Sequence, residues 1–176
     1  MGVSRGSLET TRHVTSSDAG AVRYELREQA AWVTLDRPTK RNALREQDWR
    51  ALGTALERAA DEAHVAVLEG AGAAFCAGDD VATLANLETA ADGEALGALL
   101  AESLFGIERL AVPVVAAVDG AAYGGGCELV AACDLAVATE GARFALPETK
   151  VGAYPPYAVA RPGAFGGKKR LLELAL

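Results

Sequence analysis

Apolar positions follow two kinds of pattern along this chain. In residues 45–63 and 96–110 they recur every three or four positions, the spacing of one face of an α-helix. Elsewhere they gather in short runs bounded by polar residues or glycine, which is typical of buried strands. The helical stripes comprise Trp49, Leu52, Leu56, Ala59 and Ala63, then Leu96, Leu99, Leu100, Leu104, Ile107 and Leu110. The short runs predict strands over 22–27, 31–35, 65–70, 113–119 and 134–138.

The order of these elements predicts an α/β domain in which strands alternate with helices through right-handed crossovers. A chain of 176 residues allows about one domain, and 51% hydrophobic residues allow it to bury a core. Residues 1–20 are rich in Ser, Thr and Gly and are expected to form a poorly ordered tail, so the core domain spans 21–176. The small, acidic segment 81–95 is expected to be a mobile loop, and 168–176 the start of a helix.

Charge and composition narrow the classes of function. The net charge is −7, whereas a nucleic-acid surface needs clustered Lys and Arg. No apolar run suits a secretory leader or a membrane span, so we expect a soluble cytoplasmic protein. Cys76, Cys127 and Cys133 are odd in number and lie among small apolar residues, which favours buried free thiols. His13 and His64 lack metal-ligand spacing, so no metal is expected.

Three successive glycines precede an apolar run with helical propensity. Because Gly124, Gly125 and Gly126 come directly before 127–133, their N–H groups are expected at a helix N-terminus. Unpaired donors and the positive end of the helix dipole suit an oxygen that gains negative charge. Glu128 falls in the first turn of this helix, facing whatever the glycines hold. The alternative is that this stretch has only a structural role, because glycine-rich turns that open helices are common and a first-turn Glu is often only a partner of the helix dipole.

A second loop of small residues follows another predicted strand. The strand at 65–70 leads into 71–81, just as the strand at 113–119 leads into the three glycines. Two strand-to-loop units that each end in small residues can bring two backbone donors to one point. The two loops together therefore favour a functional site over an isolated turn.

Five motifs now carry a resemblance: Leu35-Asp36-Arg37-Pro38 to Asn42-Ala43-Leu44, Ala74-Phe75-Cys76-Ala77-Gly78-Asp79-Asp80-Val81, Asp119-Gly120 to Glu128-Leu129, Cys133-Asp134, and Phe144 to Glu148. In this order they resemble the crotonase family, the enoyl-CoA hydratase/isomerase superfamily, and are most similar to enoyl-CoA hydratase. The resemblance covers residues 22–152. It implies a crotonase-like spiral of ββα units and a place in acyl-CoA and fatty acid metabolism.

The resemblance also implies site residues. An oxyanion hole for the thioester carbonyl would use the backbone N–H groups of Asp79 and Gly125, and Glu128 and Glu148 would be catalytic. Relatives that isomerise, decarboxylate or hydrolyse often lack one glutamate, so both together favour a hydratase that adds water syn to a 2-enoyl-CoA, giving a 3-hydroxyacyl-CoA. No cofactor is expected, since CoA belongs to the substrate. The implied CoA- and substrate-binding positions are Arg41, Ala77, Gly78, Asp80 and Gly124.

The chemistry explains these residue types. When water adds at the β carbon, charge gathers on the thioester oxygen, and each preorganised donor lowers the barrier by about 3 kcal/mol. We assign Glu128 as the base towards water and Glu148, with a pKa raised by apolar neighbours, as the proton donor to the α carbon. Two alternatives stay open: another crotonase-family enzyme such as an enoyl-CoA isomerase, or a non-catalytic acyl-CoA-binding or assembly protein. Arg41 either meets the CoA phosphates or belongs to a solvated basic loop.

Three departures from the family pattern bear on the site. The pair Asp79-Asp80 adds a carboxylate near the thioester, which either repels an anionic acyl group or binds a polar or cationic one. Tyr154 and Tyr157 either shape the pocket or pack. Family members continue through a C-terminal helical segment that closes the pocket and builds trimers, often paired into hexamers. A homotrimer or hexamer is thus implied, and a chain without that segment is expected to have an open, impaired site.

Overall fold

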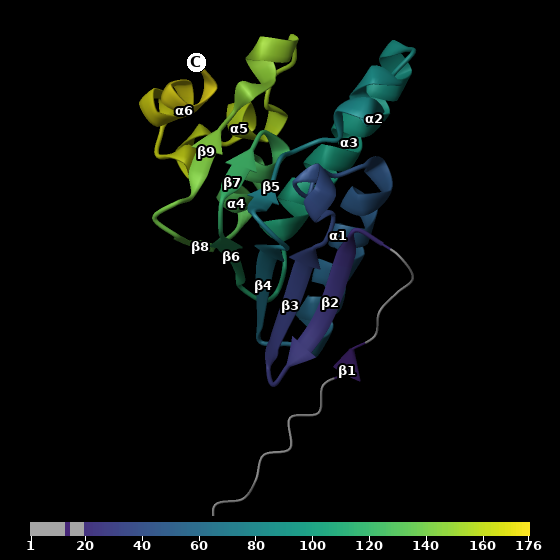
Figure 1. Ribbon diagram of the computed structural model, residues 1–176, viewed down its shortest axis with the longest axis vertical. Coiled ribbons are helices and arrows are strands. Elements are labelled where there is room, and N and C mark those ends of the chain that lie inside the picture. The colour runs from purple at the N-terminus through teal and green to yellow at the C-terminus, as the bar shows by residue number, and fades with distance from the viewer. Residues whose placement is uncertain (1–12, 15–19) are drawn as a thin grey trace, which may run out of the picture.

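The computed structural model describes residues 13–14 and 20–176, which form two sheets with helices packed around them (Figure 1). Most of the predicted N-terminal tail, residues 1–20, lies outside the described residues. Within that range, β1 (His13–Val14) pairs antiparallel with β2 (Val22–Arg27).

The larger sheet has the strand order β1-β2-β3-β4-β6-β8. The first three strands are antiparallel, and from β3 onwards each strand runs parallel to its neighbour. In register, Val33 pairs with Leu68, and Leu68 pairs with Ala116, so a fully buried row crosses the middle of the sheet. The remaining strands are β3 (Ala30–Leu35), β4 (Val65–Gly70), β6 (Val114–Val118) and β8 (Leu135–Ala138), which confirms the predicted strands to within a residue or two at their ends.

A second, smaller sheet is built from short parallel strands in the order β5-β7-β9. They are β5 (Ala74–Cys76), β7 (Ala121–Tyr123) and β9 (Arg143–Ala145). Each follows a strand of the larger sheet and precedes a helical segment: α2 (Val81–Ala85), α4 (Gly125–Ala132) and η2 (Pro147–Val151). The successive ββα units are therefore β4-β5-α2, β6-β7-α4 and β8-β9-η2. The predicted spiral of ββα units is therefore confirmed. Sequence patterns treated β5 and β7 as loop, because three residues are too few to show a period.

The two predicted amphipathic helices are present as α1 (Glu46–Glu62) and α3 (Ala90–Ile107), and they pack against each other. They bury the expected stripes, with Trp49 and Leu104 fully buried. The glycine-led helix is α4 (Gly125–Ala132), and the C-terminal helix is α6 (Lys168–Ala175). Three short 3-10 helices, η1 (Pro38–Lys40), η2 (Pro147–Val151) and η3 (Pro162–Phe165), and the single turn α5 (Pro156–Ala160) complete the described part.

The prediction of a loop over 81–95 is wrong. This segment holds α2 (Val81–Ala85) and the first turns of α3, and both helices have side-chain caps. The Asp80 carboxylate accepts the N–H of Ala82 at 3.0 Å. Thr89 and Asp92 form a reciprocal capping box, in which the N–H of Thr89 donates to Asp92 at 2.9 Å. These caps satisfy donors that a small, acidic composition does not reveal.

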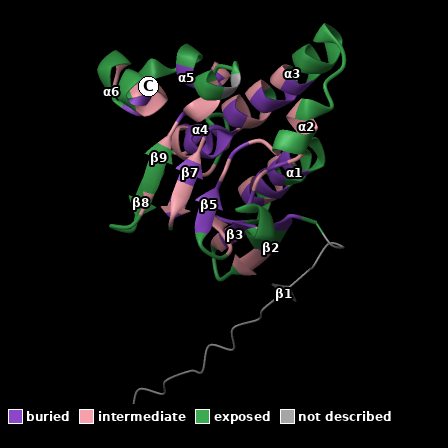
Figure 2. Ribbon diagram, turned by 45° about the horizontal axis from the view of Figure 1, so that its top comes forward, coloured by how far each residue is buried: buried purple, intermediate pink, exposed green. Residues whose placement is uncertain are grey.

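The prediction that the strand at 134–138 is buried is also wrong. β8 is the edge strand of the larger sheet, and Leu135 and Val137 are 62% and 68% exposed. Figure 2 shows β8 and β9 together as the exposed flank of the sheets. An apolar run of this length predicts a strand but not which neighbours cover it.

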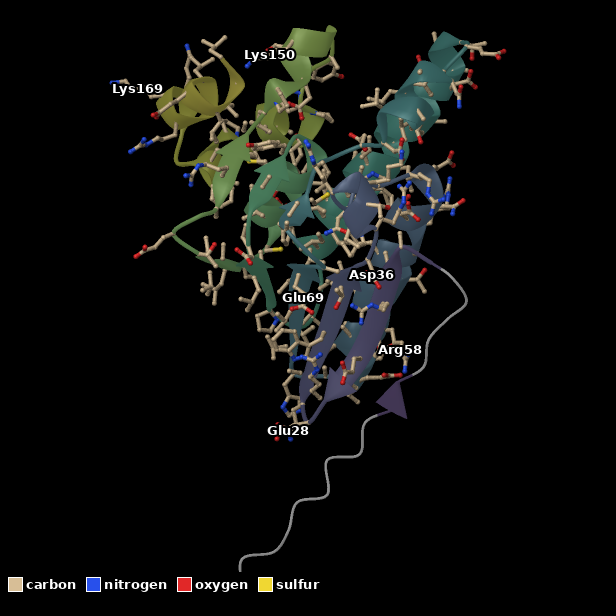
Figure 3. The ribbon with its side chains drawn as sticks, viewed as in Figure 1. Glu28, Asp36, Arg58, Glu69, Lys150 and Lys169 are labelled. Carbon is tan, nitrogen blue, oxygen red and sulfur yellow. The ribbon has the colours of Figure 1, made fainter. Side chains whose placement is uncertain are left out.

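Among the described residues, every charged residue other than Asp48 and Glu128 is at least partly exposed. Figure 3 shows Glu28 at the β2–β3 turn and Lys150 and Lys169 near the C-terminal helix, and all three are exposed. Within the described ranges, none of the helices combines the length and the apolar character needed to cross a membrane.

Candidate active site

The start of α4 lies in close contact with β5. Gly124 has φ +54°, a left-handed value that favours glycine, and its N–H donates to the carbonyl of Ala145 at 2.9 Å. A Cβ on Gly126 would lie 2.8 Å from Cβ of Cys76 and still closer to the carbonyl oxygen of that residue. The glycine run is therefore required here, because it lets the first turn of α4 lie directly on the neighbouring strand.

The loop after β5 meets the same turn. Gly78 has φ +91°, and a Cβ there would lie 2.8 Å from the Tyr123 carbonyl oxygen and 3.0 Å from the Gly125 nitrogen. The loop is held from its other side by Leu44, whose N–H donates to the Gly78 carbonyl at 2.8 Å and whose carbonyl accepts the N–H of Asp80 at 2.9 Å. The structure thus brings together the two loops predicted to share a site.

Asn42 anchors this arrangement from the η1 side. Its fully buried amide donates to the carbonyls of Ala71 and Ala74 at 2.9 and 2.8 Å. Because an unpartnered buried amide is costly, these bonds fix the path of the chain into the site loop. The sequence motif contained Asn42, but its role in holding the loop became visible only in the fold.

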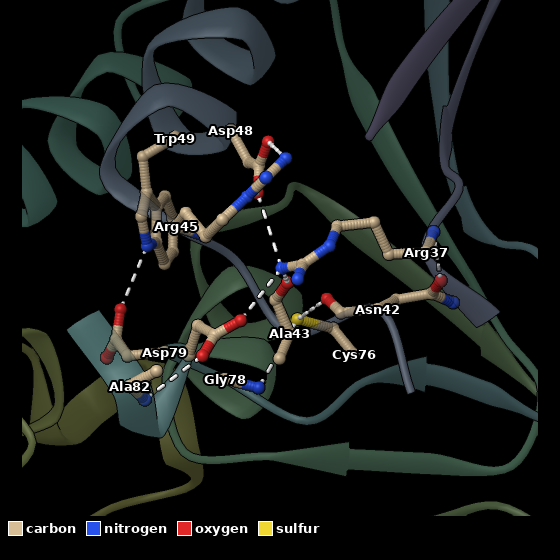
Figure 4. A network of polar contacts seen from close by, with 11 residues as sticks. Arg37, Asn42, Ala43, Arg45, Asp48, Trp49, Cys76, Gly78, Asp79 and Ala82 are labelled. Atoms are coloured by element: carbon tan, nitrogen blue, oxygen red, sulfur yellow. Dashed lines mark hydrogen bonds and ion pairs between the residues drawn. The ribbon is translucent and has the colours of Figure 1, made fainter. Parts of the chain in front are cut away.

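The side chain of Asp79 lies beside Gly125 and is held by Trp49. Nε1 of Trp49 donates to Oδ1 of Asp79 at 2.9 Å (Figure 4). A Cβ on Gly125 would lie 3.2 Å from Cζ2 of Trp49 and 3.5 Å from Oδ2 of Asp79. Burial raises the pKa of Asp79, and the Trp49 hydrogen bond acts in the opposite direction. The helical spacing of Trp49 predicted packing alone. The signal that could have revealed its second role is that a buried indole N–H needs an acceptor.

Glu128 lies in the first turn of α4, as predicted, and is 2% exposed. The N–H of Ala158 in α5 donates to its Oε1 at 2.9 Å. The pKa of Glu128 is raised to about 7. Burial is the largest cause, the Ala158 N–H acts in the opposite direction, and the charges of Glu148 and Asp79 add to the rise. A buried carboxyl that titrates near neutrality can take up or release a proton at physiological pH.

Glu148 belongs to η2 and faces the glycine turn. Its Oε1 lies 3.1 Å from the position of a Cβ on Gly124, and its Oε2 is buried with no hydrogen-bond partner among the described residues. Burial is the main cause that raises its pKa, with a contribution from the charge of Asp79, in the direction predicted for Glu148. A buried carboxyl oxygen without a partner is expensive, so it favours a protonated group or one that meets a ligand.

The turn α5, which supplies the N–H to Glu128, is anchored on α3. The hydroxyl of Tyr157 donates to Glu108 at 2.6 Å, and Nε of Arg161 lies 3.2 Å from the same carboxylate. Tyr157 is 2% exposed and packs on Phe105, with ring centroids 5.3 Å apart. Of the two tyrosines left open by the sequence, Tyr157 packs, whereas Tyr154 is 68% exposed.

The implied binding residues also have structural partners. The carboxylate of Asp80 receives Nη1 of Arg37 at 3.0 Å as well as the cap of α2, and the N–H of Ala82 followed by Arg37 lowers its pKa. The N–H of Ala77 donates to the carbonyl of Arg41 at 2.9 Å, and the side chain of Arg41 is exposed. The candidate residues Ala77, Gly78, Asp79, Asp80, Gly124, Gly125, Glu128 and Glu148 thus lie around one glycine turn, with Arg41 at the base of its facing loop.

The three cysteines are free, as predicted, with Cys76 and Cys127 buried and Cys133 partly exposed. In the part of the chain that the structure describes, three or more His, Cys, Asp or Glu side chains nowhere gather in a way that could hold a metal ion.

The spiral of ββα units and the glycine-led helix are those expected of a crotonase-like α/β protein, and comparison with known proteins agrees. The family model described as enoyl-CoA hydratase/isomerase matches residues 25–162. A probable enoyl-CoA hydratase of Rhodobacter capsulatus is 41% identical over 138 residues, covering 76% of this chain and 52% of the relative. A short-chain-enoyl-CoA hydratase of Clostridium acetobutylicum is 34% identical, covering 83% and 54%.

Comparison with solved structures agrees with the family match. The crystal structure of an enoyl-CoA hydratase from Mycobacterium smegmatis superposes with a TM-score of 0.82 at 37% identity, covering 88% of this chain and 61% of that one. The chain therefore belongs to the enoyl-CoA hydratase/isomerase family. It spans about half the length of the curated relatives it matches.

Proposed function

We propose that this chain is the catalytic core of an enoyl-CoA hydratase, a lyase that adds water to a 2-enoyl-CoA thioester. The observation that supports the proposal best is the meeting of Glu128, Glu148 and the Gly124–Gly125 turn beside the loop of Asp79. Two carboxyls with raised pKa values next to a helix N-terminus suit a reaction that moves protons while charge gathers on one oxygen.

In the proposed reaction the thioester oxygen accepts the backbone N–H groups of Asp79 and Gly125. Asp79 follows Gly78 in one loop, and Gly125 belongs to the other. A Cβ on Gly78 would lie 3.0 Å from the Gly125 nitrogen, so the two loops meet at this point. Preorganised donors cost no reorganisation when the charge develops, and each is worth about 3 kcal/mol of barrier. The positive end of the α4 dipole adds to this stabilisation.

The two glutamates divide the proton transfers. The carboxylate of Glu128 takes a proton from water as the water oxygen bonds to the β carbon, and the carboxyl of Glu148 gives a proton to the α carbon. One O–H bond of water and the C=C π bond are lost, and one C–O and one C–H bond form, so the net change is the addition of water. Proton exchange between the two carboxyls and solvent then restores their starting states. CoA arrives with the substrate, so the reaction needs no cofactor.

A second candidate is isomerisation of a 3-enoyl-CoA through a single glutamate. Oε1 of Glu128 is already engaged by the Ala158 N–H, whereas Oε2 of Glu148 is buried without a partner among the described residues. That asymmetry favours Glu148 as the only proton shuttle. A 3-enoyl-CoA substrate distinguishes the two, because an isomerase yields the 2-enoyl thioester and a hydratase leaves it unchanged.

Arg41 is proposed to meet the CoA phosphates, since its carbonyl is bonded to the site loop at Ala77 and its side chain is exposed. Assembly into a homotrimer or hexamer is also proposed. Because the chain spans about half the length of its relatives, these statements concern the whole protein.

The test is the loss of ultraviolet absorbance of crotonyl-CoA with the purified chain, beside Glu128→Gln and Glu148→Gln. We expect each substitution to lower kcat by about 10²- to 10⁴-fold, the usual contribution of a positioned acid or base. The matched control is Glu140→Gln, an exposed acid in the turn between β8 and β9. Binding of crotonyl-CoA without any turnover by the parent chain would contradict hydration and favour a binding role.

A further inference from the structure

The carboxylate of Asp79 has a fixed position beside the proposed oxyanion hole. Trp49 donates to its Oδ1 at 2.9 Å, and Trp49 itself is fully buried. Oδ2 lies 3.5 Å from the position of a Cβ on Gly125, the residue that opens α4. The side chain is therefore directed towards the glycine turn, and its direction is set by a rigid indole.

The charge on Asp79 is less compensated than that of its neighbour. Asp80 is paired with Arg37 at 3.0 Å and caps α2. Asp79 instead receives the N–H of an indole, a neutral donor. The two adjacent acids thus have different surroundings. Asp80 belongs to an ion-pair network that holds the loop, whereas the carboxylate of Asp79 lies beside the glycine turn without a cationic partner among the described residues.

The other acids around the turn carry the same sign. Glu148 lies against Gly124, and the charges of Asp79 and Glu148 both act on buried Glu128. A low-dielectric setting strengthens the repulsion between such groups, because like charges are less screened there than in water. When these acids are ionised, a ligand that brings its own negative charge next to the thioester is repelled by them as well as by Asp79.

We infer that Asp79 determines substrate specificity by excluding acyl groups that end in a carboxylate, so that the site takes uncharged acyl groups. This inference rests on the proposed function, since it places an acyl thioester at the Asp79 and Gly125 N–H groups. Only Cα and Cβ separate the carboxylate of Asp79 from the backbone nitrogen of the same residue, which is one of the two proposed donors to the thioester oxygen. The carbons that follow a thioester carbonyl held there pass close to it, and a short dicarboxylic acyl group carries its charge into this region.

The test measures binding rather than turnover, with two saturated thioesters of equal carbon number. Pentanoyl-CoA is uncharged at its acyl end, and glutaryl-CoA ends in a carboxylate. Dissociation constants for both are measured by calorimetry at pH 8 with the parent chain and with Asp79→Asn. Asparagine keeps the volume and the acceptor for Nε1 of Trp49 and removes the charge. The control is Glu140→Gln, which changes the net charge equally at an exposed turn.

We expect the parent to bind pentanoyl-CoA at least about tenfold more tightly than glutaryl-CoA, and Asp79→Asn to remove most of this preference by tightening glutaryl-CoA. Glu140→Gln should leave the ratio unchanged. Equal binding of both thioesters by the parent, or a ratio that Asp79→Asn does not move, overturns the inference and leaves the proposed hydratase intact. Binding with the expected ratio but without hydration of crotonyl-CoA overturns the hydratase and keeps the charge selection. Failure of both thioesters to bind overturns both.

Discussion

The backbone N–H of Ala158 donates to Oε1 of Glu128 at 2.9 Å, although the two residues are thirty positions apart in the chain. Glu128 is buried in the first turn of α4, and the bond reaches it from α5. Since α5 is in turn anchored to α3 through Glu108, the ionisation of a proposed catalytic acid depends on the packing of three separate helices.

The first prediction concerns stability and pH. Burial raises the pKa of Glu128 from 4.5 to about 7, so the folded state holds this proton more tightly than the unfolded state. The resulting stabilisation is complete below pH 4.5 and is lost as pH rises through about 7. Glu128→Gln cannot ionise, so its free energy of unfolding relative to the parent should rise across this window by on the order of 3 kcal/mol. Urea unfolding at several pH values measures this, and a difference independent of pH would contradict it.

The second prediction concerns the anchor of α5. Glu108→Gln weakens the contacts with Tyr157 and Arg161, so the Ala158 N–H should hold Glu128 less well and the pKa of Glu128 should rise. We expect the acidic limb of the pH profile of kcat for crotonyl-CoA to move upwards by on the order of one pH unit. The control is Glu102→Gln, an exposed acid on α3, the helix that Glu108 caps. A uniform loss of activity with an unmoved profile would show that Glu108 acts through stability alone.

The third prediction concerns the contact between α4 and β5. Gly126→Ala places a Cβ against the backbone and Cβ of Cys76, so strands and helix must separate. We expect a loss of unfolding free energy of at least about 2 kcal/mol, within the usual cost of overpacking. Gly97→Ala in α3 is the matched control, because nothing lies within 4 Å of its added Cβ, and it should stabilise by about 0.5–1 kcal/mol. Thermal and urea unfolding measure the stability of both variants. Similar changes in stability for Gly126→Ala and Gly97→Ala would contradict the close contact between α4 and β5.

The fourth prediction concerns Trp49. Trp49→Phe keeps the aromatic ring but removes the donor to Asp79, which should cost about 1–3 kcal/mol of stability. In a double-mutant cycle with Asp79→Ala, the two losses should be less than additive, because each removes the same bond. Trp32→Phe on β3 is the control, since its ring meets Arg27 rather than the site. Additive losses for Trp49 and Asp79 would show that the bond contributes nothing to stability.

Most elements could be predicted from the sequence because their signals are local. The stripe of α1 and the apolar run of β4 are each contained in a few consecutive residues. The prediction of a loop over 81–95 failed because the helical turns there depend on caps such as the carboxylate of Asp80 rather than on an apolar stripe. β8 was located correctly but its burial was not, since burial depends on neighbours outside the strand.

The candidate site shows the same division. The glycine run, Glu128 and Glu148 were found because a glycine-led helix and a sequence of family motifs are readable one residue at a time. Trp49 was missed as a partner of Asp79, and Ala158 as a partner of Glu128, because thirty residues separate each pair and no local pattern links them.

The sequence by itself determined the main strands of the larger sheet, the helices α1 and α3 and the glycine-led helix, because hydrophobic spacing and backbone freedom act over short stretches of chain. The family motifs in it added the ββα spiral and the acids of the proposed site. The tertiary structure alone decided that Asp79 faces Gly125 under the indole of Trp49, and that Glu128 is buried with a pKa of about 7. Those properties arise from desolvation and from hydrogen bonds between distant segments, which exist only once the sheets and helices have packed.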